Sequence, residues 1–170
     1  YLVRWMARAV QEPDKPGEVA VVLRGDQGTG KSFFAKELGS LFGRHFMTVS
    51  NSKHLVGNFN AHLRDCVLLF GDEAFFAGDA KHESVLKTMI TDTMIPIESK
   101  GIDTEQTRNY THLILASNSE WVITAGAVER RFFVLDVTNK SKQNLNYFEV
   151  LANQMEKGGG REALLYYLKN

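Results

Sequence analysis

The segment from Gly25 to Ser32 constrains this chain more than any other stretch of its sequence. It reads Gly-Asp-Gln-Gly-Thr-Gly-Lys-Ser, so two glycines enclose four residues and are followed by lysine and serine. A short apolar run that ends at Leu23 precedes the segment, and apolar residues at helical spacing follow it. A glycine-rich turn between a buried strand and a helix is typical of α/β proteins that bind phosphate groups.

The chemistry of phosphate explains why these residue types occur in this order. Glycines let the backbone curl until several N–H groups point inward, and the start of a helix adds the positive end of its dipole. We expect Lys31 to reach the terminal phosphates of a nucleoside triphosphate and the Ser32 hydroxyl to bind magnesium. The candidate nucleotide-binding residues are Gly25, Asp26, Gln27, Gly28, Thr29, Gly30, Lys31 and Ser32. The alternative, a glycine turn that binds nothing, is disfavoured by the full pattern in this context.

Short apolar runs bounded by polar residues or glycine predict the strands of a sheet that is buried on both faces. The predicted strands are Val19–Leu23, Phe46–Val49, Cys66–Phe70, Leu113–Ala116 and Phe132–Val137. Helical spacing of apolar residues over Ser32–Phe42 and Glu83–Ile90 places helices between them. The fold class is therefore predicted to be α/β, of the P-loop NTPase type, with a mostly parallel five-stranded sheet flanked by helices.

A hairpin is predicted as an insertion before the strand Leu113–Ala116. Thr93–Glu98 and Arg108–Leu115 flank the polar stretch Ser99–Thr107, so the second arm of the hairpin would run into that strand. The predicted organisation is an N-terminal helix and linker over 1–17, a core over 18–138 and a C-terminal helical segment over 139–170, which together make one domain. The first residue is Tyr1, so we expect the chain to be a piece of a longer protein.

Composition excludes several classes of protein. Lys and Arg together number 20, as do Asp and Glu, so the broad positive charge of many nucleic-acid-binding domains is absent. The single cysteine, Cys66, excludes an intramolecular disulfide and suits a reducing compartment. The apolar runs are too short to cross a bilayer. We therefore expect a cytoplasmic protein, in the host cytoplasm if it is viral, with no membrane partner.

Two adjacent acids follow a predicted buried strand. Val67-Leu68-Leu69-Phe70-Gly71 leads into Asp72 and Glu73. The strand would deliver both carboxylates to the carboxyl edge of the sheet, beside the glycine-rich segment Gly25–Ser32, which we call the phosphate loop. We expect Asp72 to hold magnesium and Glu73 to polarise an attacking water. The alternative is a solvated acidic pair at the end of a strand.

Further candidate catalytic residues lie later in the chain. Asn118 ends the predicted strand Leu113–Ala116, where its amide could contact the γ-phosphate and the attacking water; the alternative is a turn-forming asparagine. Arg130 and Arg131 precede the last strand, and one of them could stabilise transition-state charge on a nucleotide held by a neighbouring subunit. The alternative for this pair is a surface salt bridge with Glu129.

With these elements in order, the chain resembles the helicase part of phage and plasmid primase-helicases, within the superfamily three helicases of the AAA+ class. The stretches that carry the resemblance are Gly71-Asp72-Glu73-Ala74, Leu86-Lys87, Ile97-Glu98-Ser99-Lys100-Gly101, Ala116-Ser117-Asn118 and Glu129-Arg130-Arg131-Phe132. The resemblance extends from about Trp5 to Val137 and is closest to viral proteins that fuse a primase or primase-polymerase domain to such an ATPase. It implies a hexameric ring, nucleotide between subunits and hairpins that grip single-stranded DNA.

The resemblance also implies roles for individual residues. Lys31, Ser32, Asp72, Glu73 and Asn118 match the phosphate loop, the acidic pair and the sensor of the family. Either Arg130 or Arg131 matches its arginine finger. Lys100 matches the basic residue of its hairpin and is the leading candidate DNA contact, with Arg108 second; the alternative for Lys100 is a solvated turn lysine. The family usually has an N-terminal oligomerisation collar, whereas here only a short helix precedes the first strand.

The expected function is that of an ATP-dependent DNA helicase or translocase of a viral replication protein. Its cofactors would be ATP, or another nucleoside triphosphate, and magnesium. Its partners would be single-stranded DNA, further copies of the chain, and a primase or polymerase domain in the same parent protein. One alternative is a remodelling or loading ATPase that acts on a protein partner. Another is a non-catalytic module that binds nucleotide to hold a shape, although binding alone does not require the water-activating Glu73.

Overall fold

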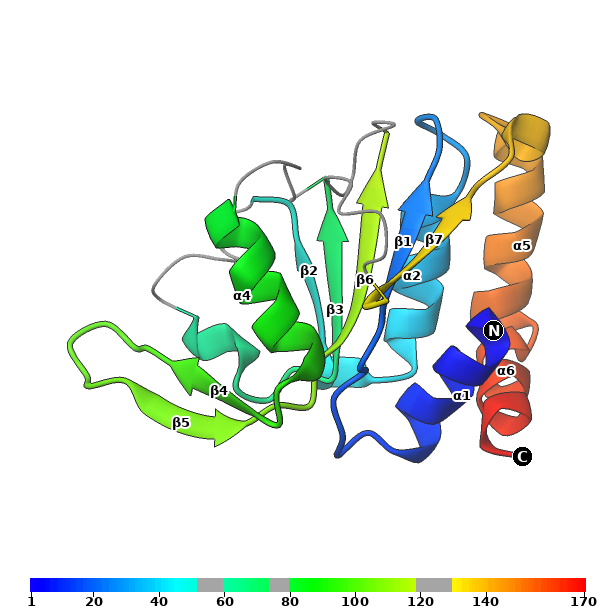
Figure 1. Cartoon of the computed structure of the whole chain (residues 1–170). Coiled ribbons are helices and arrows are strands. Elements are labelled where there is room, and N and C mark those ends of the chain that lie inside the picture. Colours follow the sequence, from blue (N-terminus) through cyan, green and yellow to red (C-terminus); the bar gives the residue numbers. More distant parts are fainter. Residues whose placement is uncertain (52–59, 74–79, 119–129) are drawn as a thin grey trace.

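The structure is a computed structural model of the 170-residue chain, and it describes residues 1–51, 60–73, 80–118 and 130–170, with the side chains of 80–83 excluded. Its main feature is a parallel five-stranded sheet in the order β2-β3-β6-β1-β7 (Figure 1). The strands of this sheet are β1 (Ala20–Arg24), β2 (Phe46–Val49), β3 (Leu68–Asp72), β6 (His112–Ser117) and β7 (Phe132–Asp136).

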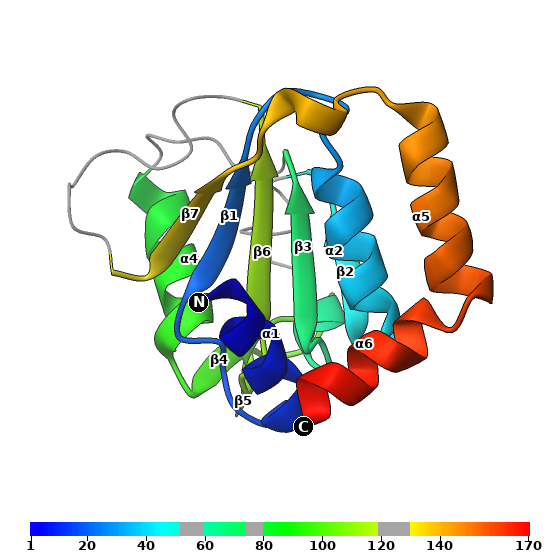
Figure 2. The same cartoon turned by 90° about the vertical axis from the view of Figure 1, so that its right-hand side faces the viewer.

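Helices cover both faces of the sheet. Figure 2 shows α4 on one side and α1, α2, α5 and α6 on the other. The helices are α1 (Leu2–Gln11), α2 (Lys31–Ser40), α4 (Ala80–Thr91), α5 (Leu145–Lys157) and α6 (Gly160–Lys169). Short 3₁₀ turns are η1 (Gly43–His45), η2 (Ala61–Leu63) and η3 (Asn139–Ser141). The prediction of an α/β fold with a mostly parallel five-stranded sheet flanked by helices is confirmed.

Alternation along the strands divides the core into two layers. In β1, Val22 packs with the layer that contains α4, whereas Val21 and Leu23 pack with the layer that contains α1 and α2. Side chains on both faces of β3 and β6 are buried in the same way. This two-sided burial explains why the central strands read as continuous apolar runs and not as alternating ones.

The hairpin differs from the prediction in its second arm. β4 (Met94–Ile97) and β5 (Glu105–Arg108) form a two-stranded antiparallel sheet, with Ile97 opposite Glu105. β5 is polar and largely exposed, and it ends at Arg108 instead of running into β6. The side chain of Asn109 terminates the arm by donating to the carbonyl oxygens of Met89 and Asp92, each at 2.7 Å. The apolar residues after Arg108 belong to the central sheet and not to the hairpin.

The C-terminal segment forms two helices that are separated by glycines. α5 ends at its C-cap Gly158, and Gly159, with φ +77°, is the N-cap of α6. α6 packs against α1, where the Gln11 side chain donates to the Leu168 carbonyl oxygen at 2.7 Å. None of the helices in the described part of the chain has the length and apolarity needed to span a membrane.

Candidate functional site

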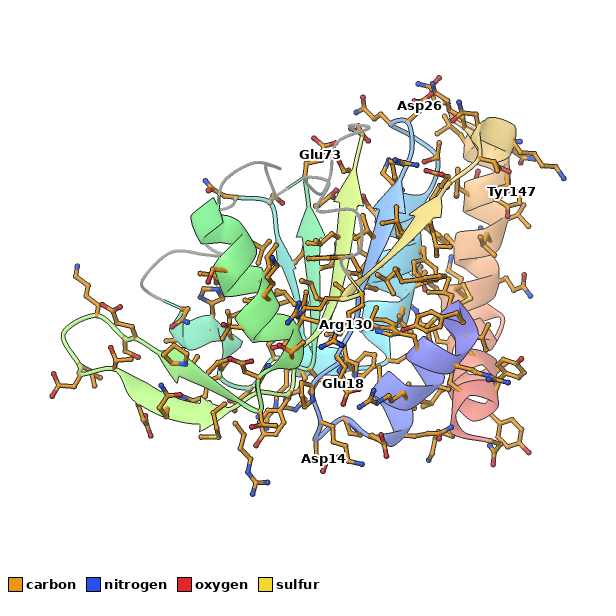
Figure 3. The ribbon with its side chains drawn as sticks, in the orientation of Figure 1. Asp14, Glu18, Asp26, Glu73, Arg130 and Tyr147 are labelled. Atoms are coloured by element: carbon orange, nitrogen blue, oxygen red, sulfur yellow. The ribbon has the colours of Figure 1, made fainter. Side chains whose placement is uncertain are left out.

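The carboxyl ends of three neighbouring strands meet at one edge of the sheet. In the strand register, Asp72 of β3 pairs with Ala116 of β6, and Leu23 of β1 pairs with the same residue. The phosphate loop after β1, the acids after β3 and Asn118 after β6 therefore lie together. Figure 3 shows Glu73 and Asp26 at this same edge. The structure brings together Lys31, Ser32, Asp72, Glu73 and Asn118, as the sequence predicts.

The phosphate loop has backbone conformations that favour glycine. Gly28 and Gly30 have φ values of +81° and +96°, in the region that other residues rarely adopt. The Thr29 hydroxyl donates to the Asp26 carbonyl oxygen at 2.8 Å and tightens the turn. Gly30 is the N-cap of α2, and Lys31 is its first residue. The loop thus delivers the N-terminus of α2 to the site, where backbone N–H groups suit an anion.

Lys31 is the buried cation of the site, with a relative exposure of 7%. Its ammonium donates to the carbonyl oxygens of Gly25 at 2.6 Å and Asp26 at 2.8 Å, and to Asn118 Oδ1 at 2.8 Å. Burial lowers the pKa of Lys31, while the nearby carboxylates of Glu73 and Asp72 act in the opposite direction. A charged group that is this well buried, with acids close by, is typical of a functional site.

Ser32 and Asp72 form the candidate magnesium site. The Ser32 hydroxyl donates to Asp72 Oδ2 at 3.0 Å, so the two oxygens already lie side by side. Hydroxyl and carboxylate oxygens are hard ligands that fit magnesium, which usually takes only one or two protein ligands and completes its shell with water and phosphate. The described residues contain no group of three or more His, Cys, Asp or Glu side chains that could hold a metal ion.

Glu73 has an unusual backbone conformation for its residue type. Its φ is +54°, a conformation that costs roughly 1–3 kcal/mol in a residue other than glycine. The Glu73 N–H donates to the Ala116 carbonyl oxygen at 3.1 Å, which holds the turn, and the Asn118 amide donates to Glu73 Oε1. Asn118 thus bridges Lys31 and Glu73, and the three form one hydrogen-bonded group at the predicted position of the terminal phosphate.

A second wall of the site comes from the segment after β7, which contains none of the site residues predicted from the sequence. The Asp26 carboxylate accepts from Lys142 Nζ at 2.7 Å and from Asn139 Nδ2 at 2.9 Å, and the first of these bonds lowers the pKa of Asp26. The Gln143 N–H donates to the Gly28 carbonyl oxygen at 2.9 Å. These contacts join residues more than 100 positions apart, and no local pattern in the sequence indicates them.

The loop, the acids and this segment enclose a cavity of about 850 Å³. Its lining residues are Gln27, Gly28, Gly30, Lys31, Ser32, Phe33, Ser50, Asp72, Glu73, Asn118, Gln143, Leu145 and Phe148. Its volume lies within the range of pockets that hold a small-molecule ligand.

Other predicted site residues lie away from this cavity. Arg130 and Arg131 precede β7 and therefore lie at the opposite end of that parallel strand, as the label of Arg130 in Figure 3 shows. The hairpin that carries Lys100 and Arg108 also extends from the opposite end of the sheet (Figure 1). Ala74 and Glu129, which belong to the stretches that carry the resemblance, lie outside the described residues.

Comparisons with known proteins connect the chain to a phage replication protein. The "DNA Primase-polymerase" of Nitratiruptor phage NrS-1 is 28% identical over 160 residues, which are 89% of this chain and 22% of that protein. Two solved structures of the NrS-1 C-terminal region, described as apo, match 99% of this chain at 25% identity, with TM-scores of 0.78 and 0.80. The chain covers 40% and 41% of those two structures, so it spans about a fifth of the curated relative and two fifths of the solved chains.

The chain is homologous to the C-terminal region of the NrS-1 primase-polymerase, and this homology corrects the predicted function. The prediction of an ATP-dependent DNA helicase or translocase is wrong, as is its alternative of a remodelling or loading ATPase. The finding that overturns both is the relative itself, which is named a DNA primase-polymerase and not a helicase. The expectation of ATP hydrolysis falls with the helicase prediction, whereas the hexameric ring stays a prediction.

Residues 23–131 match a family described as "Family of unknown function (DUF5906)". This match begins at the end of β1, contains the phosphate loop, the acidic pair and Asn118, and covers more than half of the chain. The chain therefore belongs to the DUF5906 family.

Proposed function

We propose that this chain is the nucleotide-binding module of a phage-type DNA replication protein related to primase-polymerases. Its ligand is a nucleoside triphosphate, such as ATP, with magnesium. The observation that carries the proposal is the Ser32 hydroxyl, which lies 3.0 Å from Asp72 Oδ2 beside the buried Lys31 ammonium. A turn that only connects a strand to a helix does not require a hydroxyl and a carboxylate beside a buried ammonium, whereas a site for a magnesium-bound phosphate does.

Each side chain has a distinct task in this proposal. The N–H groups of the phosphate loop and of the first turn of α2 bind phosphate oxygens, and Lys31 binds the terminal phosphates. Ser32 and Asp72 would hold magnesium, which neutralises phosphate charge when it is bound. Glu73 and Asn118 order water and phosphate oxygens at the far end of the triphosphate.

The proposal extends to the fold class of the chain, its domain organisation and its partners. The phosphate loop between β1 and α2 and the hairpin before β6 support placing the sheet in the P-loop class. The division into 1–17, 18–138 and 139–170 is proposed as the organisation of a single domain. A primase or polymerase domain in the parent protein is proposed because the relative is so named. The assignments of Lys100 and Arg108 to DNA, and of Arg130 and Arg131 to a neighbouring subunit, stay predictions.

Equilibrium binding of a fluorescent ATP analogue, with and without magnesium, tests the proposal. Replacing Lys31 with alanine removes charged hydrogen bonds worth about 1.5–3 kcal/mol, so we expect binding to weaken roughly 10- to 100-fold. The matched control is Lys36→Ala, which removes an exposed lysine from the same helix and leaves affinity unchanged. Equal affinity of Lys31→Ala and the parent protein, or no binding by the parent protein, would refute the proposal.

The magnesium ligand has its own test. In Ser32→Ala we expect the gain in affinity that magnesium provides to shrink, because one of the two oxygens at the metal position is lost. The control is Ser40→Ala at the other end of α2, where the hydroxyl donates only to the Glu37 carbonyl oxygen at 2.6 Å. The same magnesium dependence in Ser32→Ala and in the control would argue against this metal position.

A further inference from the structure

The cavity at the phosphate loop has two chemically different ends. One end carries the ammonium, hydroxyl, carboxylates and amide described above. The other is apolar and is formed by Phe33, which follows the phosphate loop directly, and by Leu145 and Phe148 of α5. The rings of Phe33 and Phe148 pack with centroids 5.8 Å apart and an interplanar angle of 54°. Triphosphate chemistry requires only the first of these two ends.

Phe148 lies directly against the phosphate loop. A Cβ atom added to Gly30 would come within 2.7 Å of Phe148 Cε1, so the ring occupies the space above that glycine. A Cβ atom added to Gly28 would likewise come within 2.9 Å of Gln143 Cγ. The aromatic end of the cavity is therefore continuous with the loop that would hold the phosphates.

Leu145 is exposed in a way that packing among the described residues does not explain. It is 81% exposed, the highest value among the large hydrophobic residues of the described chain, although it lines the cavity. Its position is fixed, because the Leu145 N–H donates to the Gln143 carbonyl oxygen at 3.0 Å and the Asn144 side chain caps α5 at Tyr147 N. An exposed leucine held at the mouth of a cavity suits an apolar part of a ligand.

The backbone before α5 is held in an uncommon conformation. Gln143 has φ +56°, and its N–H is bonded to the phosphate loop at Gly28. Together with the ion pair between Asp26 and Lys142, this bond holds the segment in place over the loop. Such a conformation costs free energy, and its presence beside a candidate ligand site favours a functional reason for it.

We propose that Leu145 and Phe148 form the nucleobase subsite of the nucleotide site. This inference rests on the proposed function, because it requires the phosphates to lie on Lys31. The base stacks on the ring of Phe148 and covers the side chain of Leu145. Stacking uses the face of the base and not its edge, so the subsite accepts different bases and favours the larger purines.

The test compares two triphosphate probes, of which only one carries a nucleoside. Magnesium–ATP carries one, and magnesium–tripolyphosphate does not. Base stacking on an aromatic side chain is worth about 5- to 100-fold in affinity, so we expect Phe148→Ala to weaken ATP binding by that factor and to leave tripolyphosphate binding unchanged. Phe148→Tyr keeps the ring and restores ATP affinity. ATP and GTP bind with similar affinity, and CTP binds more weakly.

Leu145→Ala provides a second variant that cannot fail through loss of the fold, because Leu145 is so exposed. We expect it to weaken ATP binding and not tripolyphosphate binding. Val150→Ala is the matched control, since Val150 is a 62% exposed residue of the same helix that does not line the cavity. Circular dichroism melting curves of all variants show whether the fold is retained.

The outcomes distinguish the two proposals. If the parent protein binds neither probe, the proposed function fails. If it binds ATP and tripolyphosphate equally well, nucleotide binding survives and the nucleobase subsite is wrong. If Phe148→Ala weakens both probes equally, Phe148 supports the phosphate loop and not the base, which also overturns the inference.

Discussion

His112 makes the stability of this fold depend on pH. It is the first residue of β6, has a relative exposure of 0%, and meets the ring of Trp5 edge-on at a centroid distance of 5.8 Å. Its Nδ1 lies 3.1 Å from the carbonyl oxygen of Tyr110 and 3.3 Å from that of Val67. Because both are acceptors, we assign the proton of the neutral ring to Nδ1. Nε2 has no hydrogen-bond partner among the described residues.

Burial lowers the pKa of His112 from 6.5 to about 4. Between these two values the unfolded chain binds a proton that the folded chain does not, so stability falls as the pH falls. The stability that the neutral His112 contributes to the folded state is fully present above pH 6.5 and is lost as the pH approaches 4. Its full size is roughly 3 kcal/mol, of which about 2 kcal/mol is lost between pH 7 and pH 5.

Denaturant unfolding at pH 7 and pH 5 measures this effect. We expect the parent protein to lose about 2 kcal/mol more over this interval than His112→Asn, which cannot titrate there. Carboxylates that gain stability from partners, such as Asp26 and Asp136, lose it only at lower pH, because their pKa is lowered from 3.8. Equal losses in the two proteins would refute the reasoning that burial keeps His112 neutral.

Three further predictions follow from single positions. Gly30→Ala is expected to abolish tight ATP binding, because the new side chain would meet both an unfavourable φ of +96° and the ring of Phe148. The control is Gly101→Ala, which has φ +77° but open space around it. It is expected to lower the unfolding free energy by about 1–2 kcal/mol and to leave ATP binding intact. Cys66, which is 3% exposed and whose pKa is raised to about 12 by burial, is expected to resist thiol reagents at pH 8 until the protein unfolds; rapid labelling of the native protein would contradict this. Phe70→Ala, at a fully buried position of β3, is expected to lower the unfolding free energy by about 3–5 kcal/mol in chemical denaturation, and a loss below 1 kcal/mol would contradict its place in the core.

The parts of the fold that could be predicted from the sequence are those with a local physical signature. β1, β3 and β6 are buried on both faces, so each reads as an unbroken apolar run. The phosphate loop combines glycines that need positive φ with a lysine and a serine that face the site. Since parallel strands place their carboxyl ends at one edge, the meeting of the loop with the acidic pair followed from these elements.

The second arm of the hairpin carries no comparable signature. The sequence Glu-Gln-Thr-Arg of β5 is polar and mostly exposed, so neither its composition nor its periodicity predicts a strand. Its partner β4 is held by tertiary contacts, because Asn60 donates to the Pro96 carbonyl oxygen at 2.9 Å and accepts from the Glu98 N–H at 2.8 Å. Arg64 fixes the β5 side by pairing with Glu105 at 2.8 Å. Long-range contacts of this kind determine where the hairpin strands begin and end, and a single sequence does not reveal them.

The C-terminal wall of the site follows from the position of β7 in the sheet. β7 lies beside β1 with Arg24 opposite Asp136, so the chain leaves both strands at the same place. The Val137 N–H donates to the Arg24 carbonyl oxygen at 2.7 Å, and a Cβ atom on Gly25 would meet the Val137 carbonyl oxygen at 2.7 Å. Whatever follows β7 must therefore begin against the phosphate loop.

That placement couples the loop to the C-terminal helices mechanically. The phosphate loop cannot change its shape without disturbing the bonds from Lys142 and Gln143 or the packing of Phe148, all of which precede or belong to α5. α5 in turn contacts α6, and α6 contacts α1. A ligand that reshapes the phosphate loop would thus act on the face of the molecule formed by these helices. Binding at the loop is then expected to alter hydrogen exchange in α5 before it alters exchange in β3 and β6, whose buried bonds open only with the whole sheet.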